Sequence, residues 1–179
     1  MPHSSPLCRA RATCLFRPLA GLAAALQLVS VAAPVAAAPK QTARSDTSRA
    51  ITVESGACAR ACPAFSARIA ADGAVAYNGS SNVAVIGRRS AKRPAESFAA
   101  VRDLLTEYRP AAGSEATTTG CGAAPTGGGT WTVTWEAADG TRTVLRHPAA
   151  CASERGQTVT AVLDSVPEWL GITEWVERR

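Results

Sequence analysis

Two cysteines four residues apart, Cys58 and Cys62, are the side chains of this sequence whose type and spacing are best suited to chemistry. A thiol pair with three intervening residues fits a structural disulfide, a redox-active dithiol or a site for a soft metal ion. Each of these needs its thiols in a different setting, so the elements around the pair must decide among them.

The residues that follow the pair disfavour a redox dithiol. Catalytic dithiols lie at helix N-termini with two residues between the cysteines, where the helix dipole lowers the pKa of the attacking thiol. Here three residues separate the cysteines, and residues 65–69 alternate between apolar and polar side chains, which is typical of a strand. The pattern therefore predicts no helix dipole at these thiols.

A copper site is an alternative for the same pair. The run from Cys58 to Pro63 resembles the copper-handling motif of Sco-type assembly proteins, whose two thiolates and one histidine bind copper. The matching set here is Cys58, Cys62 and His147, and two thiolates with an imidazole suit Cu(I). Those proteins have a helix directly after the motif, whereas this sequence predicts a hairpin there, and a lone histidine near a strand end is more often a surface residue. The favoured interpretation therefore includes no metal and no cofactor.

Residues 1–37 are typical of a secretory signal peptide. Three arginines precede an apolar run over residues 19–35, and small residues precede a predicted cut after Ala37. The run is interrupted by polar residues and a proline, and it is shorter than the roughly 20 apolar residues that a transmembrane helix needs. We therefore predict a periplasmic or secreted protein with no transmembrane segment in the mature chain.

Cysteine usage in the mature chain favours two structural disulfides. Two of the six cysteines lie in the predicted signal peptide, which leaves Cys58, Cys62, Cys121 and Cys151. An even number in an exported domain favours disulfides over free thiols. Of the three possible connectivities we favour Cys58–Cys62, at the start of a hairpin, together with Cys121–Cys151, between a glycine-rich loop and the far end of a second hairpin.

The charge of the mature chain gives no support to nucleic-acid binding. The sequence has 19 basic and 14 acidic residues. Removal of the three arginines of the signal peptide leaves 16 basic residues against the same 14 acidic ones, a net charge of +2. One dense basic run, residues 88–93, lies between a predicted strand and a predicted helix. We interpret it as a solvated connector, with contact to an acidic envelope protein or an anionic envelope polymer as the alternative.

Alternating side chains and turn residues predict an antiparallel sheet. Asp72-Gly73 and Asp139-Gly140 are strong signals for hairpin turns. The predicted strands are residues 51–54, 65–69, 75–77, 83–85, 131–136 and 141–147, with a long loop at residues 111–129. Trp131 and Trp135 share one strand face with Val133, which favours burial in the core over an exposed platform for sugars.

Helical periodicity predicts two main helices. The first begins at Pro94 and carries Phe98, Val101, Leu105 and Tyr108 on one face, and the second carries Val159, Val162, Leu163 and Val166 and is stopped by Pro167. A short helical piece is expected between Trp169 and Trp175. The order of strands, helix, strands and helix predicts an α+β two-layer sandwich with both helices on one face of the sheet. It forms a single domain over residues 50–179, after a flexible leader at residues 38–49.

Residues 51–108 also resemble an uncharacterised family of exported bacterial domains. Its signature is a Cys-x-x-x-Cys-Pro-x-(Tyr/Phe) motif, then an Asp-Gly-x-Val-x-Tyr-x-Gly hairpin and later a helix. The matching residues are Cys58, Cys62, Pro63, Phe65, Asp72, Gly73, Val75, Tyr77, Gly79 and Gly87. The resemblance implies an exported domain and carries over neither an activity nor catalytic residues.

These observations favour an exported, non-enzymatic binding or structural module of the cell envelope, stabilised by disulfides and without an assigned molecular function. The first alternative is a Cu(I)- or thiol-handling protein that uses the Cys-x-x-x-Cys-Pro motif. The second is an inhibitor-like module that presents loops to a protein partner, which rests on architectural analogy alone.

Overall fold

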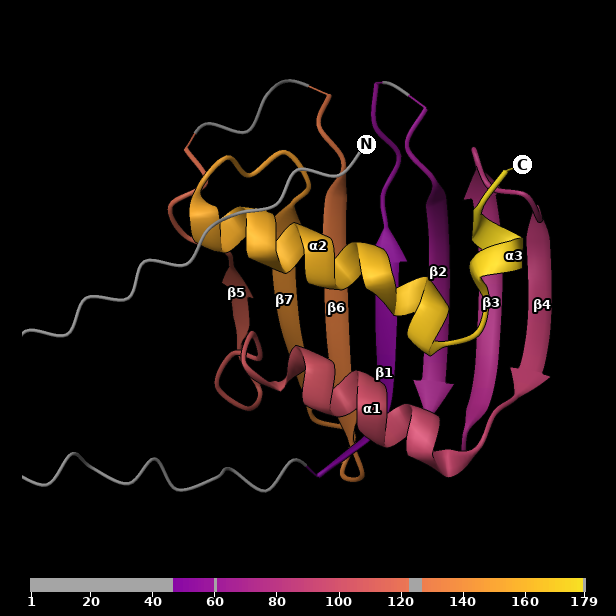
Figure 1. The fold of residues 1–179 in the computed structure, drawn as a ribbon. Coiled ribbons are helices and arrows are strands. Elements are labelled where there is room, and N and C mark those ends of the chain that lie inside the picture. Colours follow the sequence, from indigo (N-terminus) through magenta and orange to yellow (C-terminus); the bar gives the residue numbers. More distant parts are fainter. Residues whose placement is uncertain (1–46, 60, 123–126, 179) are drawn as a thin grey trace, which may run out of the picture. The chain divides into compact units, whose positions relative to one another are not determined.

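Seven strands and three helices make up the described part of the computed structural model, which comprises residues 47–59, 61–122 and 127–178 (Figure 1). The strands are β1 (Ser48–Ser55), β2 (Ala64–Ala70), β3 (Ala74–Ser81), β4 (Gly87–Lys92), β5 (Glu115–Thr117), β6 (Thr130–Ala137) and β7 (Arg142–Pro148). The helices are α1 (Ala95–Thr106), α2 (Glu154–Trp169) and α3 (Thr173–Val176). The predicted signal peptide and most of the predicted leader lie outside these residues.

All seven strands belong to one sheet, in the order β4-β3-β2-β1-β6-β7-β5. Every neighbouring pair is antiparallel except β5 with β7. Strand β1 therefore lies at the centre, and β4 and β5 are the two edges. The helices lie on one face of the sheet (Figure 1), so the predicted α+β two-layer sandwich is confirmed.

The core lies between the sheet and the helices. Successive residues of a strand point to opposite faces, so alternate positions of each strand face α1 and α2. Side chains buried there include Ile51, Val53, Val133 and Trp135 from the sheet and Val101, Leu105, Leu163 and Val166 from the helices. Trp131 is buried as well, and the prediction that the two tryptophans belong to the core is confirmed.

The basic run at residues 88–93 is not the connector that the sequence analysis predicted. Residues 87–92 form the edge strand β4, paired with β3, and the strand predicted at residues 83–85 is a loop between them. In that loop the backbone of Ala84 and Val85 donates hydrogen bonds to the carbonyl groups of Val176 and Trp175. Strand β4 escaped prediction because an exposed edge strand needs no alternation of apolar and polar side chains.

Pro167 does not stop the second helix as predicted. It lies within α2, which continues to Trp169, and its ring is buried. A proline removes one hydrogen-bond donor, and the helix is already within a turn of its end at that point. The chain instead leaves the helix at Gly171, whose positive φ of 62° suits a glycine after a helix C-terminus. Helix α1 ends at Thr106, so Tyr108 lies just beyond it.

Candidate functional site

The cysteine pair forms a disulfide in the connection from β1 to β2. The Cα atoms of Cys58 and Cys62 are 5.6 Å apart, and the backbone N–H of Cys62 also donates a hydrogen bond to Cys58 Sγ. The hydroxyl of Ser55 donates a 2.6 Å hydrogen bond to the carbonyl of Pro63 across the same loop. The disulfide therefore closes the loop between the end of β1 and the start of β2, two strands that are paired along their length.

The second disulfide joins Cys121 to Cys151, so both favoured pairs are present. It connects the loop after β5 to the segment that enters α2. A Cβ atom on Gly156, in the first turn of α2, would lie 2.0 Å from Cys151 Sγ, so only glycine fits there. Ser153 caps the helix, because its Oγ accepts a hydrogen bond from the Gly156 N–H at 3.1 Å.

His147 is fully buried, so the prediction of a surface histidine is wrong. It lies on the face of β7 that points toward the helices, together with Thr143 and Leu145. Its Nδ1 is 3.0 Å from Thr118 Oγ1 and its Nε2 is 2.8 Å from Thr160 Oγ1. Burial lowers the pKa of His147, so the imidazole is neutral at neutral pH. The alternation along β7 could have indicated this burial, but the two threonines come from segments whose proximity only the fold reveals.

The structure does not assemble the copper site considered for the sequence. Within the described residues, no three His, Cys, Asp or Glu side chains form a group that could hold a metal ion. The sulfur atoms of Cys58 and Cys62 are bonded to each other, and both nitrogens of His147 face threonine hydroxyls. The three residues proposed as ligands therefore serve separate structural contacts.

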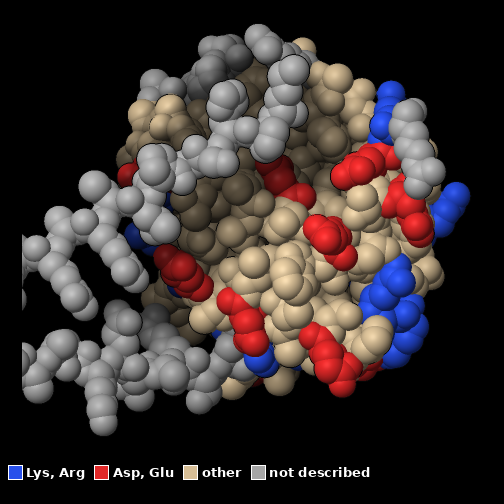
Figure 2. Space-filling model, in the orientation of Figure 1, with Lys and Arg blue, Asp and Glu red and all other residues tan. Residues whose placement is uncertain are grey.

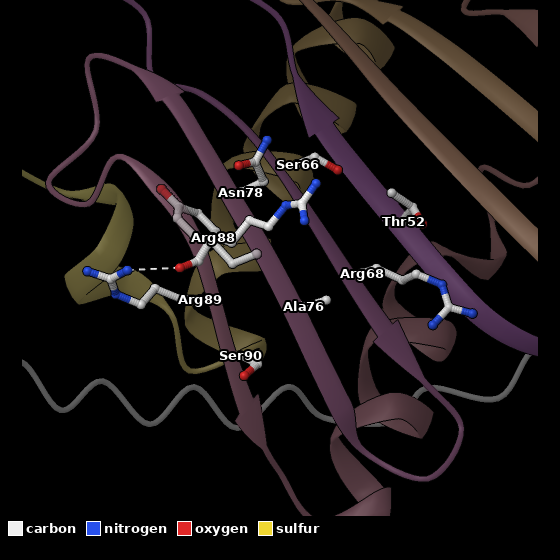
Figure 3. Close-up of a pocket in the computed structure, with 9 residues that line it drawn as sticks. Thr52, Ser66, Arg68, Ala76, Asn78, Arg88, Arg89 and Ser90 are labelled. Carbon is white, nitrogen blue, oxygen red and sulfur yellow. Dashed lines mark hydrogen bonds between the residues drawn. The ribbon is translucent and has the colours of Figure 1, made fainter.

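The face of the sheet turned away from the helices carries a shallow hollow of about 500 Å³ over β1 to β4 (Figure 3). Its lining consists of Thr52, Ser66, Arg68, Ala76, Tyr77, Asn78, Arg88, Arg89 and Ser90. The strand register explains the set, because Thr52, Arg68, Ala76 and Ser90 form one row across the four strands, and Ser66, Asn78 and Arg88 form the next. The basic run at residues 88–93, for which contact with an anionic partner was the alternative interpretation, supplies Arg88, Arg89 and Ser90, and no sequence signal indicated the lining residues of β1 to β3.

Two arginines flank the floor of this hollow. Ala76 has the shortest side chain of its row, and the long side chains of Arg68 and Arg88 extend from the strands on either side of it (Figure 3). The guanidinium of Arg68 is 3.5 Å from a carboxylate oxygen of Glu136. Arg88 forms no ion pair with the described residues, and its carbonyl accepts a hydrogen bond from Arg89 Nη1 at 2.8 Å.

A second hollow of about 750 Å³ adjoins the first and shares Ser66 and Asn78 with it. It extends past Glu54 and Arg146 to Gly56, close to the Cys58–Cys62 loop. We call the two together the sheet groove. It runs over the uncovered face from β4 toward the end of β1.

Charge differs between the two layers of the fold. Figure 2 shows acidic side chains spread over the helix side, which carries Glu96, Asp103, Glu154, Asp164, Glu168 and Glu174. The sheet groove is lined instead by Arg68, Arg88, Arg89 and Arg146, with Glu54 as its one acidic lining residue among those described. Arg68 is ion-paired with Glu136 and Arg146 with Glu115, so the arginines of the groove without an ion pair among the described residues are Arg88 and Arg89, on β4.

The lining groups of the first hollow are suited to binding an anion. Guanidinium, hydroxyl and amide groups donate hydrogen bonds, and anions accept them. The side chain of Tyr77 does not belong to this surface, because its ring is buried in the core, and this burial raises the pKa of its phenol. That hydroxyl is engaged with the carbonyl groups of Val85 and Trp175.

Fold and groove define a disulfide-linked α+β domain with an open, basic sheet face. The chain belongs to the family described as "Domain of unknown function (DUF6438)", which matches residues 49–168, from β1 almost to the end of α2. The expected membership in an uncharacterised family is thereby confirmed. No curated protein and no solved structure matches the chain. None of the helices in the described residues is long and apolar enough to cross a membrane.

The two disulfides should contribute unequally to stability. Replacing Cys121 and Cys151 with serine should lower the free energy of unfolding by about 3.6 kcal/mol, because the bond closes a loop with a sequence separation of 30. The matched replacement of Cys58 and Cys62, with a separation of 4, should cost about 2 kcal/mol. Urea unfolding of the two double variants measures both losses, and an equal or reversed order would contradict the loop argument.

Burial of His147 should make stability depend on pH. Its pKa in the folded protein lies below the unfolded value near 6.5, so the unfolded chain binds the proton first as the pH falls. The stabilisation is complete above pH 6.5 and is lost as the pH falls toward the folded pKa, at up to about 1.4 kcal/mol per pH unit. Urea unfolding between pH 7 and pH 5 should show this slope, and His147→Gln should flatten it. Equal slopes would contradict the assignment.

Proposed function

We propose that this protein is exported and acts in the periplasm or outside the cell as a non-enzymatic binding module. Two features support this proposal. Residues 1–37 have the composition of a secretory signal peptide, and the folded domain contains two disulfides, which persist in oxidising compartments. Both disulfides lie in loops at one end of the sheet, and the Cys58–Cys62 loop adjoins the groove.

The proposed binding surface is the sheet groove, and its ligand is an anionic component of the cell envelope. The observation that carries this proposal is the placement of Arg68 and Arg88 on either side of Ala76. Ser66, Asn78 and Ser90 add neutral hydrogen-bonding groups around the two guanidinium groups. Charge-assisted hydrogen bonds from arginine suit carboxylate, phosphate and sulfate groups.

Cross-strand neighbours distinguish this surface from an ordinary solvated sheet face. On such a face opposite charges stand across from each other and neutralise one another. Here the residue across from Arg88 is Asn78. Arg68 stands between Thr52 and Ala76, and its guanidinium pairs with Glu136 at 3.5 Å. The positive charge of Arg88 is therefore available to a ligand.

Export and oxidation are tested together by expression of the full sequence with its natural N-terminus. The mass of the protein recovered from the periplasm or medium should correspond to a chain that begins at Ala38, and thiol titration without reductant should find no free thiol. A retained N-terminal segment would contradict export by cleavage. Two reactive thiols mapped to Cys58 and Cys62 would favour the alternative of a thiol-handling protein.

Binding is tested with inorganic polyphosphate as a model anionic polymer. Replacing Arg68 and Arg88 with alanine should weaken the affinity by about tenfold or more, because each removed guanidinium takes charge-assisted hydrogen bonds with it. A charge-matched control replaces Arg142 and Arg155, exposed residues outside the first hollow, and should change the affinity by less than about threefold. Equal losses in both variants, or a wild type that binds neither polyphosphate nor an acidic peptide, would overturn the proposed site.

A further inference from the structure

The edge strand β4 borders the first hollow, and its outer side is open within the described residues. We propose that the anionic ligand is an extended acidic segment of another protein, which adds to the sheet as a new strand beside β4. This inference rests on the proposed function, because it names the chemical class of the ligand for the same groove.

The hydrogen-bond pattern shows which backbone groups of β4 face outward. The N–H of Arg93 donates to the carbonyl of Gly73 at 2.8 Å, one step beyond the register that pairs Lys92 with Ala74. In an antiparallel pair every second residue faces its partner strand. Positions 87, 89, 91 and 93 therefore bond to the β3 side, and Arg88, Ser90 and Lys92 direct their N–H and C=O groups away from it.

These outward groups have no backbone partner in the described part of the chain. The carbonyl of Arg88 accepts a hydrogen bond from the exposed side chain of Arg89, which an incoming strand can displace. A row of open N–H and C=O groups on an edge strand is the template for addition of a peptide strand.

Charge selects an acidic occupant for this edge. Arg88 and Arg89 are exposed and form no ion pair with the described residues, whereas Lys92 pairs with Asp72 at 2.9 Å. Basic side chains on an edge also oppose pairing with the same edge of a second copy. The same charges attract an acidic strand, so protection against self-association and selection of the ligand have one cause.

Geometry links the added strand to the hollow. Neighbouring strands lie about 4.8 Å apart, and alternate side chains point to the same face. Every second side chain of an added strand would therefore stand on the uncovered face, beside Arg88 and Ser90. Acidic residues at those alternate positions would complement the guanidinium of Arg88. Ile86, which is 57% exposed just before β4, offers an apolar contact at one end.

The test compares two fluorescent, end-capped peptides of four Glu-Thr repeats. One is unmodified, and in the other every second backbone nitrogen is methylated, so that all the methyl groups lie along one edge of the extended peptide. Both peptides carry the same charge, but the methylated one cannot donate hydrogen bonds along that edge. We expect the wild-type protein to bind the unmodified peptide at least about tenfold more tightly than the peptide whose methylated edge faces β4. Two methylated peptides, one for each edge, cover both orientations of the added strand.

A pair of variants at Ser90 tests the protein side of the same bonds. Ser90→Pro removes one outward N–H and leaves the β3-facing bonds of Arg89 and Ala91 in place, which an edge strand tolerates. Ser90→Ala keeps that N–H and removes only the hydroxyl. Both variants lack the hydroxyl, so they are compared with each other: Ser90→Pro should bind the peptide about tenfold more weakly than Ser90→Ala, and the two should bind polyphosphate equally.

The outcomes separate this inference from the proposed function. Equal binding of methylated and unmodified peptides, or binding of polyphosphate without peptide, overturns strand addition and leaves the anion-binding groove standing. Failure of the wild-type protein to bind either polyphosphate or the peptide overturns the proposed groove itself. If Ser90→Pro fails to fold by circular dichroism, the comparison of peptides on wild-type protein decides the question alone.

Discussion

Coverage of the sheet on one side only is the constraint on which the rest of this structure depends. Helices α1 and α2 bury one face of the strands, and the other face must then consist of side chains that tolerate water. Each strand therefore alternates between core residues and polar or small ones. The sheet groove lies on the polar face that this alternation produces, where the short side chain of Ala76 stands between the strands that carry Arg68 and Arg88.

Patterns among neighbouring residues of the sequence predicted most of the architecture. The two Asp-Gly turns, the alternation around Trp131 and Trp135 and the helical spacing from Phe98 to Leu105 depend on neighbours along the chain, and they predicted the hairpins, the core and α1. The sequence predicted a strand at residues 83–85 and a connector at residues 88–93, whereas the structure has a loop at the first stretch and strand β4 at the second. Val83 is buried by contacts with the core, so its apolar character indicated burial without indicating a strand.

The sequence indicated only one part of the candidate site, the basic run that includes Arg88 and Arg89. Arg68, Ala76 and Arg88 are distributed over three strands, and only the register brings them into one surface. The cysteines drew attention because thiol spacing is chemically distinctive, whereas serine, asparagine and arginine occur on many solvated surfaces. His147 was misplaced because its two hydroxyl partners come from a loop and a helix that lie far from each other in the sequence.

The C-terminal segment is fastened to the loop that precedes the edge strand. Carbonyl groups of Trp175 and Val176 accept hydrogen bonds from that loop, and the Arg178 side chain donates one to Val83 at 3.1 Å. These residues follow the stretch that the family match covers. Removal of residues 175–178 would therefore take away the hydrogen bonds that hold this loop, and the edge strand would lose its support at that end.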